Sequence, residues 1–210
     1  MKSRFIFPLI ALILSLTGII SCKKDGPTYS VEGVIWDRSN NQAMGNVTVR
    51  VYEQYPGGIE ELKFEINSDN SGKYNFALPR AKYQGLVLEY YKDGCFQEKI
   101  VKSLSELRTD EVNKIDVCMT YESTIAIHIK NVGSTNQLVR ITNSKGKTDC
   151  DLCCTQSVRT FQSTNLDTTY YCPNDANFPY EIFYQIGGIA SGYETKTAAP
   201  GETAVIYIEY

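Results

Sequence analysis

Basic residues are too few and too scattered in this sequence to form a surface for nucleic acid. Its 21 lysine and arginine residues stand against 24 aspartate and glutamate residues, and the formal net charge is −3. Affinity for nucleic acid rests on lysine and arginine side chains that neutralise phosphates, and attachment to an anionic membrane surface also needs a basic cluster. We therefore expect no nucleic-acid partner and no polybasic contact with a membrane.

Groups that support the common catalytic mechanisms are also scarce. His128 is the only histidine, and strand alternation places it on an outward face without an orienting partner. The sequence has no glycine-rich phosphate loop, EF-hand loop or zinc-protease motif. The acidic pairs Glu60/Glu61 and Asp149/Asp151 fall in expected turns or exposed strand faces, where solvated charge is the usual explanation. The sequence predicts a protein that is not an enzyme and needs no cofactor.

A hydrophobic run long enough to cross a bilayer is missing as well. The apolar segment 5–20 is shorter than the roughly 20 residues of a spanning helix, and Pro8 and Gly18 interrupt it. Lys2 and Arg4 precede this segment, and small residues follow it. A basic start, a short apolar core and a small-residue exit are typical of an export signal peptide. The alternative to a lipoprotein signal is an ordinary secretory signal with a cysteine at its boundary by chance.

The end of this segment, Ile19-Ile20-Ser21-Cys22, resembles the lipobox of bacterial lipoproteins. In that family the cysteine receives a diacylglyceryl group and a further acyl chain such as palmitate, after cleavage just before it. The resemblance implies a signal peptide at 1–21, a lipidated tether at 22–29 and contact with the membrane through lipid on Cys22. Segment 21–25 also resembles lipoproteins of Bacteroidetes. This implies the outer membrane, on its periplasmic or its surface face.

Six further cysteines predict disulfide bonds, because an even number in an exported protein is typical of a disulfide framework. They are Cys95, Cys118, Cys150, Cys153, Cys154 and Cys172. If disulfides stay within domains, Cys95 pairs with Cys118 across neighbouring strands. We expect no free thiol in the mature protein.

The four later cysteines allow two pairings that the sequence does not separate. Either Cys154 pairs with Cys172 and Cys150 with Cys153, or Cys150 pairs with Cys154 and Cys153 with Cys172. The C-x-x-C spacing also suits zinc, but the usual zinc site has a second C-x-x-C pair, and an oxidising compartment favours disulfides. We expect no metal.

Apolar and polar residues alternate along many short segments, as in half-buried strands of antiparallel sheets. The expected strands lie near 46–52, 62–66, 74–78, 86–91, 96–101, 115–120, 125–130, 137–142, 157–162, 180–186 and 203–210. Turn residues separate them, and one or two turns within 103–111 are the only helix expected. The sequence thus predicts an all-β chain with two consecutive small antiparallel β-sandwich domains, 30–121 and 122–210, after a lipoprotein signal peptide.

Three segments of the first half, 31–37, 45–49 and 68–76, occur in a recognisable order. They resemble the first strand, the Gly-Val strand start and the Asp-x-x-Gly-x-Tyr-x-Phe hairpin of the carboxypeptidase regulatory-like family, a transthyretin-like β-sandwich. Asp37 falls one position later than in that family, whereas the hairpin matches. The resemblance covers 31–121 and implies a sandwich module without an activity. The second half is expected to form another sandwich of immunoglobulin-like type, although it lacks the Cys…Trp…Cys pattern of antibody domains.

Fifteen tyrosines and one tryptophan leave binding as the expected function. Exposed aromatic rings stack on sugars or anchor protein interfaces, although tyrosine is also a good strand former. The candidate binding aromatics are Trp36, Tyr90, Tyr91, Tyr170 and Tyr171. Thr168, in Asp167-Thr168-Thr169, resembles the O-glycosylation acceptor of exported Bacteroidetes proteins. We expect a cell-envelope lipoprotein that binds or scaffolds a protein partner. The alternative is a surface glycan-binding lipoprotein accessory to an outer-membrane transporter.

Overall fold

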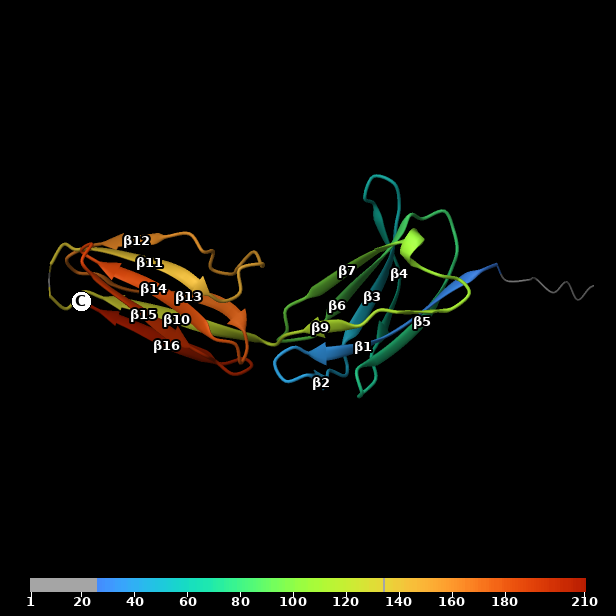
Figure 1. Ribbon diagram of the computed structural model, residues 1–210, viewed down its shortest axis with the longest axis horizontal. Coiled ribbons are helices and arrows are strands. Elements are labelled where there is room, and N and C mark those ends of the chain that lie inside the picture. Colours follow the sequence, from blue (N-terminus) through green and yellow to red (C-terminus); the bar gives the residue numbers. More distant parts are fainter. Residues whose placement is uncertain (1–25, 134) are drawn as a thin grey trace, which may run out of the picture.

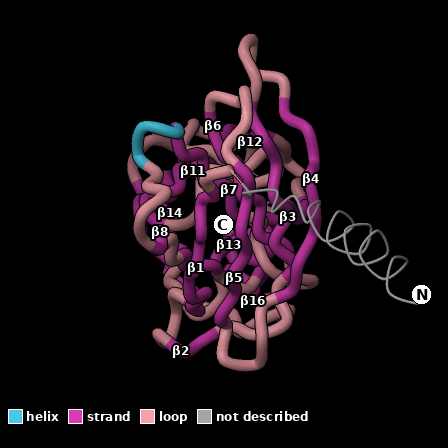
Figure 2. Tube along the Cα trace, turned by 90° about the vertical axis from the view of Figure 1, so that its right-hand side faces the viewer, coloured by secondary structure: helices cyan, strands magenta, loops and turns pink. Residues whose placement is uncertain are grey.

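The computed structural model describes residues 26–133 and 135–210. The expected signal peptide, the predicted lipidation site Cys22 and the first part of the expected tether lie outside the described residues. Within the described residues, the one helical segment is the 3-10 turn η1 (Leu104–Glu106), inside the range where the sequence predicted a short helix (Figure 2). The all-β sandwich fold predicted from the sequence is confirmed.

The first sandwich consists of two sheets. The strands are β1 (Thr28–Asp37), β2 (Gln42–Ala43), β3 (Thr48–Gln54), β4 (Glu60–Asn67), β5 (Lys73–Pro79), β6 (Gly85–Tyr91), β7 (Glu98–Ser103), β8 (Val112–Lys114) and β9 (Val117–Met119). One sheet has the order β2-β1-β5, with β8 and β9 pairing in parallel with β1, and the other has the order β4-β3-β6-β7. Strand alternation directs the apolar residues of both sheets into the space between them.

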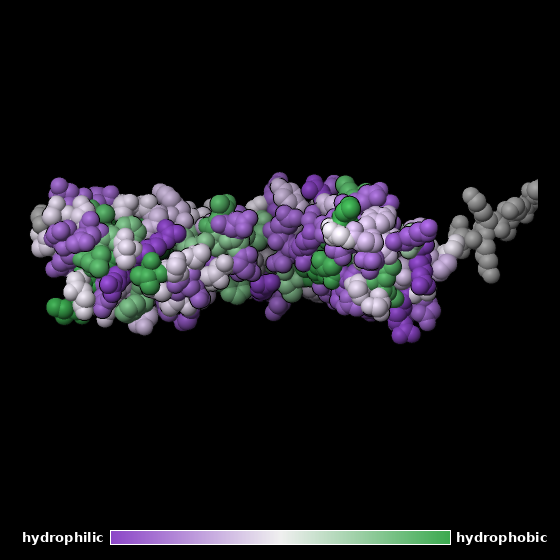
Figure 3. Space-filling view, turned by 90° about the horizontal axis from the view of Figure 1, so that it is seen from above, coloured by the Kyte–Doolittle hydropathy of each residue, from purple (hydrophilic) through white to green (hydrophobic). Residues whose placement is uncertain are grey.

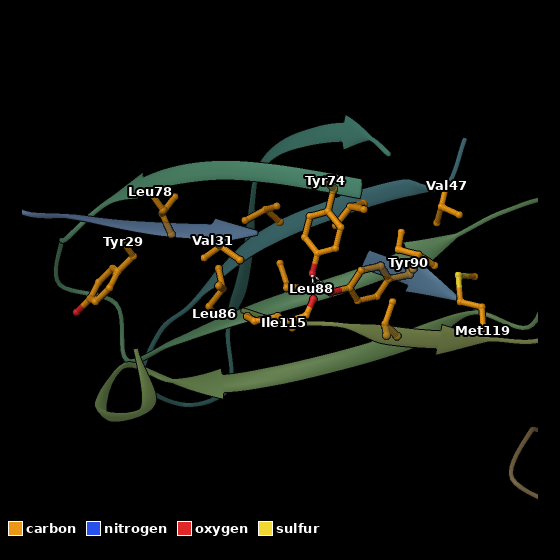
Figure 4. Close-up of a cluster of buried hydrophobic side chains, with 14 of the residues drawn as sticks. Tyr29, Val31, Val47, Tyr74, Leu78, Leu86, Leu88, Tyr90, Ile115 and Met119 are labelled. Carbon is orange, nitrogen blue, oxygen red and sulfur yellow. Dashed lines mark hydrogen bonds between the residues drawn. The ribbon is translucent and has the colours of Figure 1, made fainter. Parts of the chain in front are cut away.

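The core of the first sandwich is built from these inward residues and contains two hydrogen-bonded tyrosines. The Tyr74 hydroxyl donates to the carbonyl oxygen of Ile115 at 2.5 Å and lies 2.7 Å from the Tyr90 hydroxyl (Figure 4). Burial raises the pKa of Tyr74 to about 12. Gly33, on β1, passes close to the same carbonyl, because a Cβ built on it would lie 1.9 Å from the Ile115 oxygen. Only glycine therefore fits where β1 passes the Ile115 carbonyl.

The second sandwich also has two sheets. The strands are β10 (Glu122–Lys130), β11 (Leu138–Lys145), β12 (Arg159–Gln162), β13 (Asp167–Asp175), β14 (Tyr180–Ile186), β15 (Ala190–Lys196) and β16 (Thr203–Glu209). The orders are β13-β10-β16 and β12-β11-β14-β15. A separate core, which includes Ile125, Ile127, Tyr180 and Ile206, lies between these sheets.

The strands and their pairing differ from the sequence-based expectation in both sandwiches. β2, β8, β13 and β15 were not predicted as strands. β8 and β9 pair in parallel with β1, and β16 pairs in parallel with β10, where antiparallel sheets were expected. The segment of β13 begins with Asp167 and ends with Pro173, Asn174 and Asp175, which are poor strand formers or turn residues. Its pairing with β10 along nine residues outweighs that local preference.

The two sandwiches lie end to end in an elongated molecule (Figure 1). β1 begins at one end of the long axis, and the C-terminus lies at the opposite end. The space-filling view shows hydrophilic residues mixed with scattered apolar ones, and atoms continue without a break from one sandwich to the other (Figure 3). Each sandwich has its own hydrophobic core, one drawn from residues 29–119 and the other from residues 125–208.

Candidate binding surface

The outer side of the three-stranded sheet β13-β10-β16 carries the most exposed pair of tyrosines on one sheet face among the described residues. The strand register sets Tyr171, Ala126 and Val205 side by side in one row, and Thr169, His128 and Tyr207 in the next. Asp167, Lys130 and Glu209 form a third row. We call the nine residues of these three rows the outer tyrosine face. The alternate residues of the same strands point into the second core.

Tyr171 and Tyr207 dominate the outer tyrosine face, with 65% and 64% of their surface exposed. They lie on opposite sides of β10, one row apart, and the small side chain of Ala126 lies beside Tyr171. Because Ala126 is buried in the sheet surface, the two rings rise above it. Exposed tyrosines around a small residue provide flat apolar contact with a hydroxyl at the edge, which suits protein anchors and sugar stacking alike.

His128 is held between the neighbouring strands at the centre of its row. Its Nδ1 lies 2.9 Å from the Thr169 hydroxyl, its Nε2 lies 3.5 Å from an Asp167 carboxylate oxygen, and its ring meets the Tyr207 ring edge to face at 5.5 Å. The imidazole side chain is 24% exposed. It lies on the outward face, as predicted, but Thr169, Asp167 and Tyr207 surround it. These contacts hold the His128 ring between Thr169 and Tyr207.

The charges of the outer tyrosine face lie along one edge. Lys130 pairs with Asp167 at 3.8 Å, so the two charges largely offset one another. Exposed ion pairs of this kind contribute little to stability, about 0 to 1 kcal/mol. The face therefore presents two aromatic rings and a histidine beside a polar rim without a strong charge of one sign.

The aromatic residues singled out from the sequence do not form one patch. Of the five, only Tyr171 lies on the outer tyrosine face. Tyr90 was wrongly predicted as a binding residue: it lies in the first core, because alternation along β6 directs it inward. Trp36 and Tyr91 are exposed, but on different sheets of the first sandwich.

Tyr170 also faces inward, which corrects its prediction as a binding residue. Its ring stacks on Phe161 at 5.9 Å, and the Arg159 guanidinium lies 4.6 Å from its ring centre. Burial raises the pKa of Tyr170 to about 12. Tyr207, by contrast, was missed from the sequence. The alternation of Val205, Tyr207 and Glu209 with buried isoleucines was the available signal.

Thr168, the predicted glycosylation acceptor, is half-buried within β13. It pairs with Ile129 of β10 and points to the same side of the sheet as Tyr170 and Cys172. Thr169, the following residue, is the exposed one. The fold therefore places the hydroxyl of Thr168 on the side of β13 that packs against the second core.

The four later cysteines form two disulfide bonds, and they select one of the two pairings left open by the sequence. Cys150 bonds to Cys153, and Cys154 bonds to Cys172, with Cα–Cα distances of 5.1 and 5.2 Å. Cysteines in disulfides offer no thiolate to a metal. Within the described part of the chain, no group of three or more histidine, cysteine, aspartate or glutamate residues is arranged to hold a metal ion.

The predicted Cys95–Cys118 disulfide is wrong, and with it the expectation of no free thiol. Cys95 is buried in the first core, where its sulfur lies 3.9 Å from the sulfur of Met44. Cys118 lies between the buried Val117 and Met119, so it points out of the sandwich. β9 pairs with β1, and Cys95 pairs with Tyr121 instead. The Cys95 thiol therefore faces the core, and the Cys118 thiol faces solvent.

No helix in the described ranges is long and apolar enough to span a membrane. A hollow of about 300 Å³ lies over the first sandwich near Gly33 and Tyr74. The Tyr74 hydroxyl is already bonded to Ile115, and the Asp116 carboxylate accepts from the Val34 amide at 2.8 Å. These groups are therefore occupied in holding β1 in place.

No family model and no curated protein matches the chain. Among solved structures, it is similar to the TIE protein of Bacillus anthracis at 17% identity, over 87% of this chain and 33% of that protein, with a TM-score of 0.38. It is also similar to a shaft pilin of Lactobacillus rhamnosus GG (13% identity, 87% and 97% covered, TM-score 0.35). A minor pilin of Streptococcus agalactiae gives 12% identity, 86% and 94% coverage, and a TM-score of 0.37. At these TM-scores, the fold assignment rests on the strand pairing of the chain itself.

Proposed function

We propose that this protein is a non-enzymatic lipoprotein of the cell envelope, anchored to the outer membrane through Cys22, that presents the outer tyrosine face to a protein partner. The observation that carries the proposal is the pair Tyr171 and Tyr207, exposed on one sheet of the second sandwich around a fixed histidine. Tyrosines that are surrounded by polar residues are enriched among the residues that dominate the energy of protein interfaces.

The arrangement of the two sandwiches supports different roles for them, the first as a spacer and the second as the binding domain. The tether enters at the β1 end of the long axis, and the second sandwich lies at the far end (Figure 1). With lipid on Cys22, the first sandwich acts as a spacer and the second as the binding head. Inward-facing residues of the head form its core, so the outer tyrosine face remains available to a partner.

We assign the first sandwich to the carboxypeptidase regulatory-like type, in keeping with its role as a spacer. The hairpin that carries the resemblance has the geometry its sequence requires. The Asp69 carboxylate accepts hydrogen bonds from the amides of Ser71 and Lys73, and Gly72 adopts a φ of 71°. Tyr74 then enters the core, as the motif implies.

Glycan binding, as an accessory to an outer-membrane transporter, is the second candidate function. The observation that favours it is the combination of two exposed rings with neighbouring hydroxyl, imidazole and carboxylate groups from Thr169, His128 and Asp167. Rings can stack on the faces of sugars while such polar groups bind their hydroxyls. With Lys130 set against Asp167 and Glu209, the rim carries a slight excess of negative charge, which suits an uncharged polysaccharide better than an acidic one.

Replacing Cys22 with alanine should remove the protein from the membrane fraction, because lipid on this residue is the proposed anchor. Each buried methylene of an acyl chain contributes about 0.8 kcal/mol, so the loss of several chains abolishes stable attachment. Acyl labelling and fractionation of envelopes would measure this. Cys118→Ala is the matched control, since it removes another exposed cysteine and should leave labelling unchanged. Full labelling of the Cys22→Ala variant would refute the anchor.

A photo-cross-linking residue in place of Tyr171 should give a discrete protein adduct in intact cells. The same residue in place of Tyr193 is the control, because Tyr193 is equally exposed but belongs to the opposite sheet. Alanine at Tyr207 should weaken the adduct, since loss of an interface anchor costs about 2 kcal/mol or more. Adducts of equal yield from both positions, or from neither, would contradict the assignment to this face. Binding of purified surface polysaccharide that is lost in Tyr171→Ala would favour the glycan function instead.

A further inference from the structure

The connection between the two sandwiches contains no free linker. Tyr121 closes the first sandwich, and β10 of the second begins at the next residue. On one side, the Phe96 amide donates to the Thr120 carbonyl at 3.0 Å, and the Glu122 amide donates to the Gly94 carbonyl at 2.7 Å. These two bonds tie the connecting residues to the first sandwich.

The same connecting residues are bonded to the second sandwich on their other side. The Ala176 amide donates to the Tyr121 carbonyl at 2.8 Å, and the Gly201 amide donates to the Glu122 carbonyl at 2.8 Å. The Thr120 hydroxyl also donates to an Asp175 carboxylate oxygen at 2.5 Å. Four backbone hydrogen bonds and one from the Thr120 side chain therefore hold the connecting residues to both sandwiches.

Lys147, from the loop after β11, crosses this junction with a buried side chain. Only 6% of its side chain is exposed. Its ammonium group lies 2.9 Å from Asp149 and 3.5 Å from Asp175, both in the second sandwich. The same group lies 4.6 Å from the centre of the Phe96 ring, which belongs to the first sandwich. The negative face of an aromatic ring attracts an ammonium group electrostatically, and this attraction is stronger when the ammonium group is buried.

Charged groups on both sides of the junction act on one another. Glu98, in β7, pairs with Arg38 at 3.7 Å. Burial raises the pKa of Glu98, while the positive charges of Arg38 and Lys147 oppose that shift. The hydrogen bond from Lys147 lowers the pKa of Asp149. Lys147 thus has anionic neighbours from both sandwiches around it, and its charge offsets the repulsion among them.

We propose that Lys147 is a latch that fixes the angle between the two sandwiches, so that the chain behaves as one rigid rod. Domains within a chain ordinarily move relative to one another unless their interface is extensive. Here a short connection that is hydrogen-bonded to both sandwiches, and a buried cation over Phe96, replace a large interface. The inference rests on the junction alone and holds whether or not the outer tyrosine face binds a partner. If it does, the latch also holds that face at a set distance from the anchor.

Distances between spin labels on the two sandwiches test this directly. Residues 22–210 are exported behind an exchanged secretion signal with Cys22→Ser, so that lipid is absent. One label is placed on the exposed Cys118 and the other on a cysteine introduced by Glu209→Cys. We expect a single narrow distance distribution by double electron–electron resonance. A broad distribution in this parent chain would overturn the proposal at once.

The variant Lys147→Ala should lose the narrow peak while both sandwiches stay folded by circular dichroism. Lys145→Ala is the matched control: it removes the same charge two residues away, where the lysine is exposed and pairs with Glu181 inside the second sandwich. Its distribution should remain narrow. Phe96→Leu removes the ring from the other side of the junction and should broaden the distribution even if Lys147→Ala fails to fold. A narrow peak retained in both Lys147→Ala and Phe96→Leu would refute the latch.

Discussion

Replacing Gly33 with alanine should lower the free energy of unfolding of the first sandwich by at least about 3 kcal/mol, a large part of the 5–15 kcal/mol typical of a domain. The added Cβ would lie 1.9 Å from the Ile115 oxygen and 2.7 Å from the Tyr74 hydroxyl. Neither neighbour is free to move. The Ile115 amide is bonded to the Glu32 carbonyl, and the Ile115 oxygen accepts the hydrogen bond of Tyr74.

Trp36 makes this effect measurable in one sandwich alone. It is the only tryptophan and belongs to β1, so its fluorescence during urea unfolding follows the first sandwich. The control is Gly26→Ala, because a Cβ at that position meets nothing within 4 Å. Its unfolding free energy should stay within about 0.5 kcal/mol of the parent. Coincident transitions for Gly33→Ala and Gly26→Ala would show that the backbone at Ile115 yields to the added methyl group.

Removing the Cys154–Cys172 disulfide should destabilise the second sandwich by roughly 3 kcal/mol, because the bond closes a ring across 18 residues of sequence. Both cysteines are buried in the second core, so the double variant Cys154→Ala and Cys172→Ala also loses packing. For a domain of this size, such a loss lowers the melting temperature by more than about 10 °C. Hydrogen exchange of β13 peptides, measured by mass spectrometry during heating, would report on this sandwich.

The Cys150–Cys153 bond provides the matched control for that prediction. It spans a sequence separation of only three residues, so the double variant Cys150→Ala and Cys153→Ala removes the same chemical group from a much smaller ring. Loop-closure entropy gives it a smaller contribution of roughly 2 kcal/mol. Equal losses from the two double variants would indicate that ring size does not govern the stability of this domain.

Strand prediction from the sequence succeeded where alternation was strong and failed where composition opposed it. Segment 125–130 alternates isoleucine with other residues, and it forms β10 at the centre of its sheet. β13 has turn residues at both ends, Asp167 at its start and Pro173 and Asn174 near its end, and these obscure the strand formers between them. It becomes a strand because β10 supplies hydrogen-bond partners along its whole length. Local preference is a weak guide where such pairing is available.

The candidate surface was only partly accessible to sequence reasoning. Tyr171 was singled out as one of five aromatics, but Tyr207 was not. The two residues come together only because β13 and β16 pair with opposite edges of β10, β16 in parallel. A parallel neighbour that is distant along the chain leaves no hairpin signal in the sequence. The burial of Lys147 against Phe96 was also not foreseen, because it depends on a contact between the two sandwiches.

Where alternation is strong, as in segment 125–130, the sequence by itself determined which residues face inward, since side chains alternate with a period of two in any β-strand. It thereby established the all-β class and the outward position of His128. Tertiary structure alone decided which strands are neighbours. That decision separated Cys95 from Cys118, joined Cys154 to Cys172 and set Tyr171 beside β10 with Tyr207. Strand pairing depends on the packing of residues far apart in the chain, and local patterns do not carry that information.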